Sequence, residues 1–287
     1  MAELKPYRGS YYLWNYVPST VAAAIFAALF ALGSFYIIWR MFRTRAWFCI
    51  PFALGGLFEL VGYCARAAAR DKTDQLTPFI IQNILILVAP ALFAASVYMV
   101  LGRLIRSLDA ESHSVVPVKW LTKIFVFGDV VSFIVQASGG GIMSTGNSIK
   151  TGENIILGGL FVQIIIFALF AVTAAIFHAR LDRRPTEASL ERSSTWRSTM
   201  MMLYVVSVLI MVRSIFRVVE YIMGHDGYPL RNEWTLYVFD ALLMFGVVVV
   251  FAWRFPGGRV PSKSKGRDTG EPSVELQGSV SDLTQLK

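Results

Sequence analysis

Residues 17–39 read VPSTVAAAIFAALFALGSFYIIW, and residues 236–253 read LYVFDALLMFGVVVVFAW. The first run contains no charged side chain, and the second contains only Asp240. A helix needs about 20 predominantly apolar residues to cross the hydrocarbon core of a bilayer, and both runs approach or reach that length. The whole chain is 55% hydrophobic and only 16% charged. These features predict an all-α, polytopic membrane protein and exclude a soluble globular enzyme and a disordered chain.

Seven apolar stretches are long enough to span the membrane, and they predict a seven-transmembrane helix bundle over residues 17–254. The stretches are residues 17–39, 47–68, 78–102, 118–141, 153–179, 199–223 and 233–253. The fourth is the weakest because it carries Lys123, Asp129 and Gln136. All seven tryptophans fall at or near a predicted span end, which is where this residue type meets the membrane–water interface.

The positive charges predict the orientation of the bundle. Lys and Arg outside the spans concentrate in the first, third and fifth connections and in the C-terminal tail. Since cytoplasmic connections carry the excess of Lys and Arg, residues 1–16 are predicted to be extracellular and the tail to be cytoplasmic. The tail, residues 255–287, is rich in Ser, Gly and Lys and is predicted to be disordered. The formal net charge of +8 follows from this topology, so we expect no nucleic-acid partner.

Polar side chains inside the predicted spans are the candidate binding residues, because each buried charge there costs at least about 2.5–3.5 kcal/mol. Glu59, Tyr63 and Arg66 share one face of the second span, and three charged residues share one face of the sixth. By depth, most of the set lies in the outer half of the membrane and predicts an outward-opening polar cavity. The candidate substrate-binding residues are Glu59, Tyr63, Arg66, Gln82, Asp129, Gln136, Gln163, Arg213, Arg217, Glu220 and Asp240.

A competing interpretation is that these groups form buried ion pairs that fix the register of the helices. Four acids nearly balance three arginines inside the spans, as self-pairing requires, and Arg217 with Glu220 is the clearest candidate pair. A cluster drawn from four helices that reaches the midplane favours a binding cavity over register alone. In that cavity, Glu59 and Asp240 would bind a headgroup or carry a proton, and Gln136 and Gln163 would supply hydrogen bonds.

Several membrane chemistries lack the residues that they need. The chain has no Gly-Lys-Ser/Thr phosphate loop, which excludes an ATPase in this chain. Its histidines, His113, His178 and His225, are scattered and provide no ligand set for an intramembrane zinc site or a haem. We therefore expect no metal, no cofactor and no enzymatic activity.

The order of the motifs resembles the fungal lipid-translocating exporter family, the RTA-like seven-transmembrane proteins. The matching pieces are Glu59-Leu-Val-Gly62-Tyr63-Cys-Ala-Arg66, Gln82 with Leu87-Val-Ala-Pro90, Ala94-Ala95-x-x-Tyr98, Asp129, Gln136-Ala-Ser-Gly139, Gly158-Gly159 with Gln163, Arg213-Ser-Ile-Phe216-Arg217-Val-Val-Glu220, and Glu233 with Tyr237-Val-Phe-Asp240. One departure is Phe255, where the family often has His.

The resemblance implies a fungal, multi-pass integral membrane protein, at the plasma membrane or an internal membrane. It implies export or flipping of sphingoid long-chain bases, resistance to toxic amphiphiles and, in some members, porphyrin-type compounds. Our first hypothesis is a transporter of amphipathic lipids, whose partners are the lipid substrate and the surrounding membrane lipids. A seven-helix receptor or sensor for a lipid-like ligand and an intramembrane lipid-modifying enzyme stay open as alternatives.

Overall fold

The computed structural model of the 287-residue chain describes Trp14, Tyr16 and residues 18–71, 73, 75–144, 149–191, 193–224 and 227–256. All regular structure within these residues is helical. Most of the predicted extracellular N-terminus, the predicted disordered tail beyond residue 256, and His225 lie outside the described residues.

Six long helices and one composite segment build the bundle. The long helices are α1 (Thr20–Thr44), α2 (Ile50–Ala68), α3 (Leu76–Ser107), α4 (Val118–Ser144), α5 (Ile149–Arg183) and α7 (Ser193–Ile222). The last apolar segment is continuous from α9 (Glu233–Leu236) through the π-helix η4 (Tyr237–Ala241) into α10 (Leu242–Trp253). The short elements are η1 (Trp47–Cys49), η2 (Ala69–Asp71), η3 (Glu111–His113), α6 (Glu187–Glu191) and α8 (Tyr228–Arg231).

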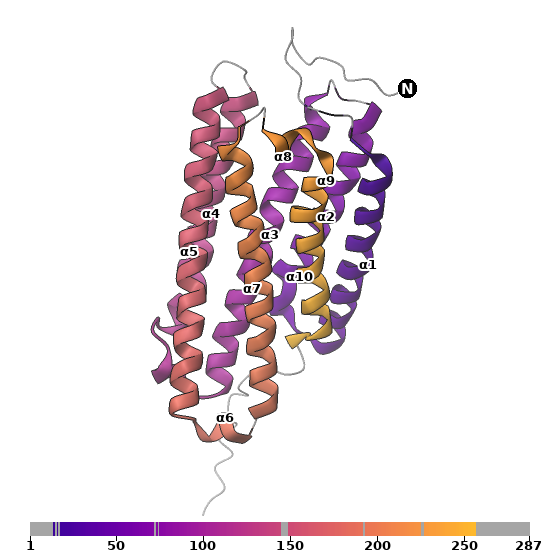
Figure 1. Ribbon diagram of the computed structural model, residues 1–287. Coiled ribbons are helices and arrows are strands. Elements are labelled where there is room, and N and C mark those ends of the chain that lie inside the picture. Colours follow the sequence, from indigo (N-terminus) through magenta and orange to yellow (C-terminus); the bar gives the residue numbers. More distant parts are fainter. Residues whose placement is uncertain are drawn as a thin grey trace, which may run out of the picture.

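The helices close into a ring in which neighbours in sequence are mostly neighbours in space (Figure 1). α1 packs on α2, α2 on α3, α3 on α4 and α4 on α5, then α5 on α7, α7 on α10 and α10 back on α1. α3 also contacts α7 across the middle of the ring. This arrangement brings residues from the second, third, sixth and seventh predicted spans to one interior.

Six helical segments are long and apolar enough to cross a membrane, where the sequence predicts seven spans. They are Thr20–Thr44, Trp47–Ala68, Leu76–Ser107, Lys150–Arg183, Ser193–Ile222 and Glu233–Trp253. Each coincides with a predicted span, so an integral, multi-pass membrane protein is confirmed. The fourth predicted span does form a helix, α4, but α4 is not among these six. Its polar residues Asp129 and Gln136 are buried against neighbouring helices.

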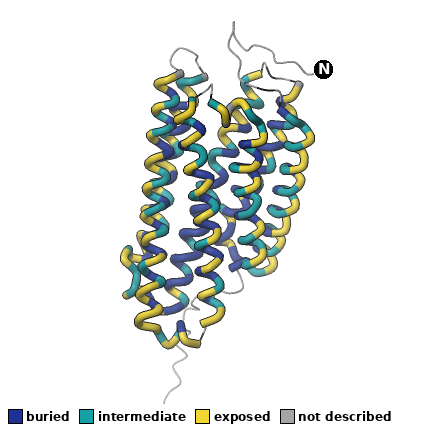
Figure 2. Tube along the Cα trace, viewed as in Figure 1, coloured by how far each residue is buried: buried dark blue, intermediate teal, exposed yellow. Residues whose placement is uncertain are grey.

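The side chains are arranged as expected for a bundle surrounded by lipid. Exposed residues follow the outer faces of the helices, and buried residues face the interior (Figure 2). Leu32 is 71% exposed and Phe127 70% exposed, although both are strongly apolar. Inside, Phe52 stacks on Phe251 with ring centroids 3.8 Å apart and lies 4.6 Å from Phe93. These rings form part of the apolar core of the bundle.

Candidate functional site

The polar stripe predicted on the second span lies on the buried face of α2. Glu59 and Tyr63 are fully buried, and Arg66 is 1% exposed. Gly62 lies between them and permits close contact with α3, since a Cβ atom at this position would lie 2.7 Å from Ile86 Cγ1. The stripe predicted from spacing is therefore present, and a glycine lets α3 pack directly against it.

A network of charged side chains links α7 to η4 in the centre of the bundle. The Arg213 guanidinium donates to one oxygen of Asp240, and Arg217 donates to the other over 2.9 Å. Arg217 also donates to Glu220 over 2.9 Å, which confirms the ion pair predicted from their spacing. A second nitrogen of Arg213 donates to the Ile86 carbonyl of α3 over 3.0 Å. The charges in this network balance, because two arginines meet two carboxylates.

Glu59 lies beside this network but outside its hydrogen bonds. The charges of Asp240, Arg213 and Arg217 all act on its carboxyl group. Within the described residues, neither carboxyl oxygen of Glu59 has a hydrogen-bond partner, and the same holds for the Tyr63 hydroxyl and the Gln82 side-chain oxygen. Buried polar groups are usually paired, because an unmet one costs about 1–3 kcal/mol. Glu59 is thus a surplus acid next to a balanced set of charges.

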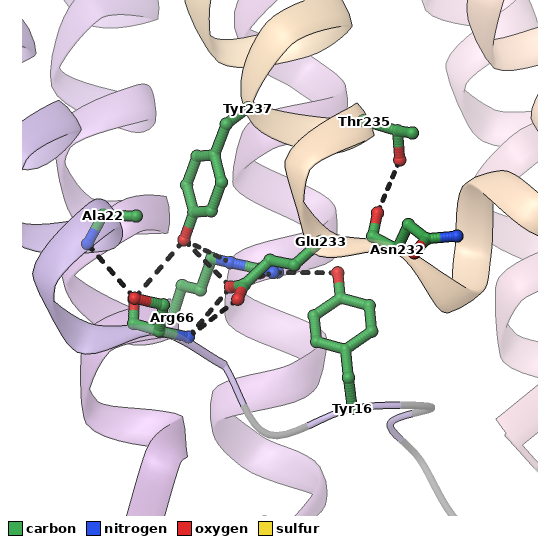
Figure 3. Close-up of polar contacts among 8 residues, drawn as sticks. Tyr16, Ala22, Arg66, Asn232, Glu233, Thr235 and Tyr237 are labelled. Atoms are coloured by element: carbon green, nitrogen blue, oxygen red, sulfur yellow. Dashed lines mark hydrogen bonds and ion pairs between the residues drawn. The ribbon is translucent and has the colours of Figure 1, made fainter.

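A second network ties together the end of the bundle where α1 and α9 begin and α2 ends (Figure 3). Arg66 donates to Glu233 over 2.8 Å, to Tyr16 over 2.9 Å and to the Tyr237 hydroxyl over 3.1 Å. Glu233 also accepts the backbone N–H of Ser19, which precedes α1, over 2.9 Å. Arg66 and Glu233 together therefore join α2, α9 and the residue that precedes α1.

Aromatic rings complete the environment of Arg66. Its guanidinium carbon lies 5.6 Å from the ring centroids of both Trp14 and Tyr16, and 5.3 Å from that of Tyr237. Burial raises the pKa of Tyr16 above its ordinary value of 10.0, although the neighbouring charge of Arg66 acts in the opposite direction. The phenol therefore remains neutral at physiological pH and accepts the hydrogen bond from Arg66.

A third group of polar side chains connects α3, α4 and α5. The Tyr98 hydroxyl donates to Asp129 over 2.9 Å. Gln136 donates to Gln163 over 3.0 Å and to Ser132 over 2.8 Å, and Ser132 in turn donates to the Gly159 carbonyl over 2.7 Å. These contacts hold α4 against its neighbours, which explains how a helix with so many polar residues is accommodated in an apolar bundle.

The π-helical turn η4 sets the positions of two buried polar residues on the last segment. Tyr237 and Asp240 stand at its first and fourth positions. Both are buried, with Tyr237 contacting Arg66 and Asp240 contacting the two arginines of α7. A π-turn inserts one extra residue per turn and changes the direction of the side chains around it, and such turns are frequent at functional sites.

The predicted residues form three groups and not one continuous cluster. Two hollows on the described structure, of about 450 and 230 Å³, are lined by residues outside the candidate set. The larger is formed by α1 (Tyr36, Trp39, Arg40, Arg43, Thr44), and the smaller by α7 (Tyr204, Val205, Val208, Leu209). The outward-opening cavity therefore stays a prediction, and the structure shows the polar groups in a closed arrangement.

Several residues that hold these groups together were not among the predicted site residues, and Glu233 and Tyr98 are two of them. Glu233 and Tyr98 both fall within the matching motifs, yet neither was assigned a role. Glu233 lies in the first turn of the last predicted span, where acidic residues are common because they interact favourably with the helix N-terminus. Tyr98 has a large aromatic ring, which is typical of a residue in a hydrophobic core. Their partners, Arg66 and Asp129, lie on other helices, so the pairing becomes visible only in the tertiary structure.

Comparison with known proteins identifies the family. The family model described as "RTA1 like protein" matches residues 52–263. The chain belongs to the RTA1-like family. It is 36% identical to Protein RTA1 of Saccharomyces cerevisiae over 85% of this chain and 84% of that protein. The family predicted from the motifs is thus confirmed.

Two further relatives carry names that state a cargo. The chain is 42% identical to Protoporphyrin uptake protein 1 of Saccharomyces cerevisiae, over 71% of this chain and 67% of that protein. It is 26% identical to Sphingoid long-chain base transporter RSB1 of Saccharomyces cerevisiae, over 81% of this chain and 69% of that protein. No solved structure matches the chain at a significant level.

Proposed function

We propose that this RTA1-like protein moves cationic amphipathic lipids across the bilayer, with sphingoid long-chain bases as the first candidates. The observation that carries the proposal is the buried carboxyl group of Glu59, which has no hydrogen-bond partner within the described residues. Because Arg213 and Arg217 are already matched by Asp240 and Glu220, an ionised Glu59 leaves one negative charge over. A single ammonium headgroup neutralises that charge.

The names of the relatives support transport of an amphiphile but differ in the charge of the cargo. A sphingoid base carries an amine, whereas a protoporphyrin carries carboxylates. Glu59 favours the amine, because a carboxylate cargo would have to compete with Asp240 and Glu220 for the arginines. In this mechanism, Arg213 and Arg217 hold Asp240 ionised, and Glu59 is the acid that binds the headgroup.

Transport requires the closed arrangement to open. The headgroup enters toward Glu59 while the acyl chain of the lipid stays in the bilayer. Only the headgroup therefore has to move into the protein interior. The Arg66–Glu233 network covers the end of the bundle and must rearrange to admit the headgroup from that side. The chain has no nucleotide-binding motif, so the proposal assigns the driving force to a gradient or to facilitated exchange.

We further propose a membrane topology and a cellular membrane for the protein. We place seven spans in the membrane by counting α4, with residues 1–16 outside and the tail in the cytoplasm, and we place the protein in the plasma membrane. α4 supports this count, because its 27 residues are enough to cross the hydrocarbon core and its polar residues face α3 and α5. The proposal contains no covalent chemistry, so the lipid leaves unchanged.

The test is the exchange of a labelled sphingoid base across proteoliposome membranes that contain the purified protein. Wild type accelerates exchange relative to empty liposomes, and Glu59→Gln reduces the rate at least about tenfold, since a charge-assisted hydrogen bond contributes about 1.5–3 kcal/mol. Glu111→Gln, the same change at an exposed acid, serves as the matched control and retains the wild-type rate.

Two further measurements complete the experiment. Mass spectrometry recovers the base unmodified, and a modified product would mean that the protein is an enzyme. Labelled protoporphyrin in the same liposomes tests the opposite charge preference. Acceleration of porphyrin exchange without acceleration of base exchange, or equal rates for wild type and Glu59→Gln, would show that the assignment to cationic lipids is wrong.

A further inference from the structure

One face of α1, at the end that leads into η1, carries positive charge beside a hollow. The hollow has a volume of about 450 Å³ and is lined by Tyr36, Trp39, Arg40, Arg43 and Thr44. These positions follow helical spacing, so they lie on one side of α1. None of them belongs to the proposed transport site.

The two arginines beside the hollow are oriented by aromatic rings. Arg40 donates to the Tyr36 hydroxyl over 2.9 Å, and its guanidinium carbon lies 5.1 Å from the ring centroid of Phe255. The guanidinium carbon of Arg43 lies 5.4 Å from the ring centroid of Trp39. Within the described part of the chain, neither arginine forms an ion pair with an acid. Two adjacent positive charges are therefore left without a counterion among the described residues.

The tryptophans place this face at the level of the lipid headgroups. Trp39, Trp47 and Trp253 are 53%, 52% and 73% exposed, and they lie near the adjacent ends of α1, η1 and α10. Exposed tryptophans at the ends of membrane helices mark the interface between hydrocarbon and water. Directly along the same side of α1, Leu32 is 71% and Phe35 is 60% exposed. Acyl chains have an apolar surface immediately beside the arginines.

We propose that Arg40 and Arg43 bind the phosphate group of an anionic phospholipid whose acyl chains lie along Leu32 and Phe35. The planar guanidinium can donate two parallel hydrogen bonds to the oxygens of a phosphate, which gives the contact geometric specificity as well as strength. Contacts with the Tyr36 and Trp39 rings already restrain the two arginine side chains, so less conformational entropy is lost when they bind a ligand. The adjoining apolar side distinguishes a lipid headgroup from free phosphate, because only the lipid gains contacts there.

Native mass spectrometry of the full-length protein tests the proposal, with phosphatidic acid and phosphatidylcholine of identical acyl chains as the probes. Wild type binds phosphatidic acid more tightly than phosphatidylcholine. Each arginine near an anionic lipid contributes about fivefold, so Arg40→Gln with Arg43→Gln weakens phosphatidic acid binding roughly 25-fold. Arg183→Gln with Arg184→Gln removes two exposed arginines at the end of α5 and leaves binding unchanged.

Three outcomes would overturn the proposal. These are equal binding of the two lipids by wild type, unchanged binding in the Arg40/Arg43 double variant, and an equal loss in the Arg183/Arg184 control. Inorganic phosphate supplies a further arm, since its displacement of the lipid would assign the site to free phosphate. If the double variant fails to fold, Arg43→Gln alone replaces it, because that exposed side chain packs on the Trp39 ring at the surface. A loss of about fivefold is then expected.

Discussion

At the scale of single residues, the interior of the bundle holds two kinds of acid. Asp240 accepts hydrogen bonds from two arginines, and Glu233 accepts them from Arg66, Tyr237 and the Ser19 backbone. Glu59 accepts none from the described residues. A paired acid stabilises the fold mainly by neutralising and hydrogen-bonding its buried partners. An unpaired buried acid lowers the free energy of unfolding, because its desolvation is not compensated. Under the proposed function, this difference separates the structural acids from the cargo-binding acid more sharply than burial does, because all three acids are largely removed from solvent.

The first prediction is that Asp240→Asn destabilises the protein and Glu59→Gln does not. The asparagine leaves Arg213 and Arg217 without their shared carboxylate, which costs about 3–5 kcal/mol for a buried pair. Glutamine at position 59 removes no hydrogen bond, so the cost stays within about 1 kcal/mol.

Thermal melting in detergent measures this difference through the exposure of the buried Cys49 thiol to a reactive dye, with Cys64→Ser as background. Asp240→Asn melts at a clearly lower temperature than Glu59→Gln. Equal melting temperatures for the two variants would contradict the division between paired and unpaired acids.

The second prediction concerns Tyr16, whose pKa is raised by burial from 10.0. The folded protein holds the proton of this phenol more tightly than the unfolded chain does. The resulting stability is fully present below pH 10.0 and is lost as the pH rises toward the folded-state pKa. Wild type therefore loses melting temperature more steeply above pH 10.0 than Tyr16→Phe does.

Melting curves across the alkaline range check this, and the phenylalanine variant is the internal control because it keeps the ring over Arg66. At lower pH, the variant melts below wild type by a constant amount that reflects the lost hydrogen bond from Arg66. Parallel curves above pH 10.0 would show that Tyr16 does not contribute.

At the scale of elements, glycines decide how closely the helices approach. A Cβ atom at Gly159 of α5 would lie 2.6 Å from Gln136 Cγ and 3.0 Å from the Ser132 carbonyl oxygen of α4. At the adjacent Gly158, nothing lies within 4 Å. The two glycines thus have different roles, although they are neighbours in sequence. The absence of a side chain at Gly159 lets α4 approach closely enough to form its hydrogen bonds with α5, whereas Gly158 plays no part in this contact.

The third prediction is that Gly159→Ala and Gly158→Ala have opposite effects on stability. The first forces α4 and α5 apart and costs about 1–3 kcal/mol through overpacking against backbone atoms. The second raises the free energy of unfolding by about 0.5–1 kcal/mol, because alanine favours the helix more than glycine does.

Melting temperatures of the two variants, made singly, measure this contrast. Gly158→Ala is the matched control, since it adds the same methyl group one residue away. A loss of the same size at both positions would indicate that α4 and α5 do not pack as described.

At the scale of the whole molecule, the count of spans decides on which side of the membrane each end lies. Six segments satisfy the length and hydropathy that a span needs, and α4 lies among them in the ring with a similar length (Figure 1). With α4 included, the two ends of the chain lie on opposite sides. With α4 excluded, they lie on the same side.

The fourth prediction is that an N-glycosylation acceptor inserted within residues 1–16 is modified in yeast membranes, and that one inserted within residues 257–287 is not. The reason is the excess of Lys and Arg on the connections that share a side with the tail. A shift in gel mobility that a glycosidase reverses measures the modification. Modification at both ends would show that the number of spans is even.

The sequence by itself determined that the chain is a helical membrane protein, where the six candidate spans lie among the seven stretches that it predicts, and which family the chain belongs to. These features follow from apolar runs and local motifs, which depend on neighbouring residues. The pairing of Arg217 with Glu220 was equally predictable, because helical spacing brings them together.

Only the tertiary structure decided how the polar residues are shared among partners. Arg66 lies seven positions from Glu59 on the same stripe, yet it pairs with Glu233, 167 residues away in sequence, while Glu59 has no partner within the described residues. The physical reason is that these pairings depend on helix rotation, on close approach at Gly62 and on the π-turn at Tyr237–Ala241. Periodicity places side chains on a face of one helix, but packing decides which face of which other helix they meet.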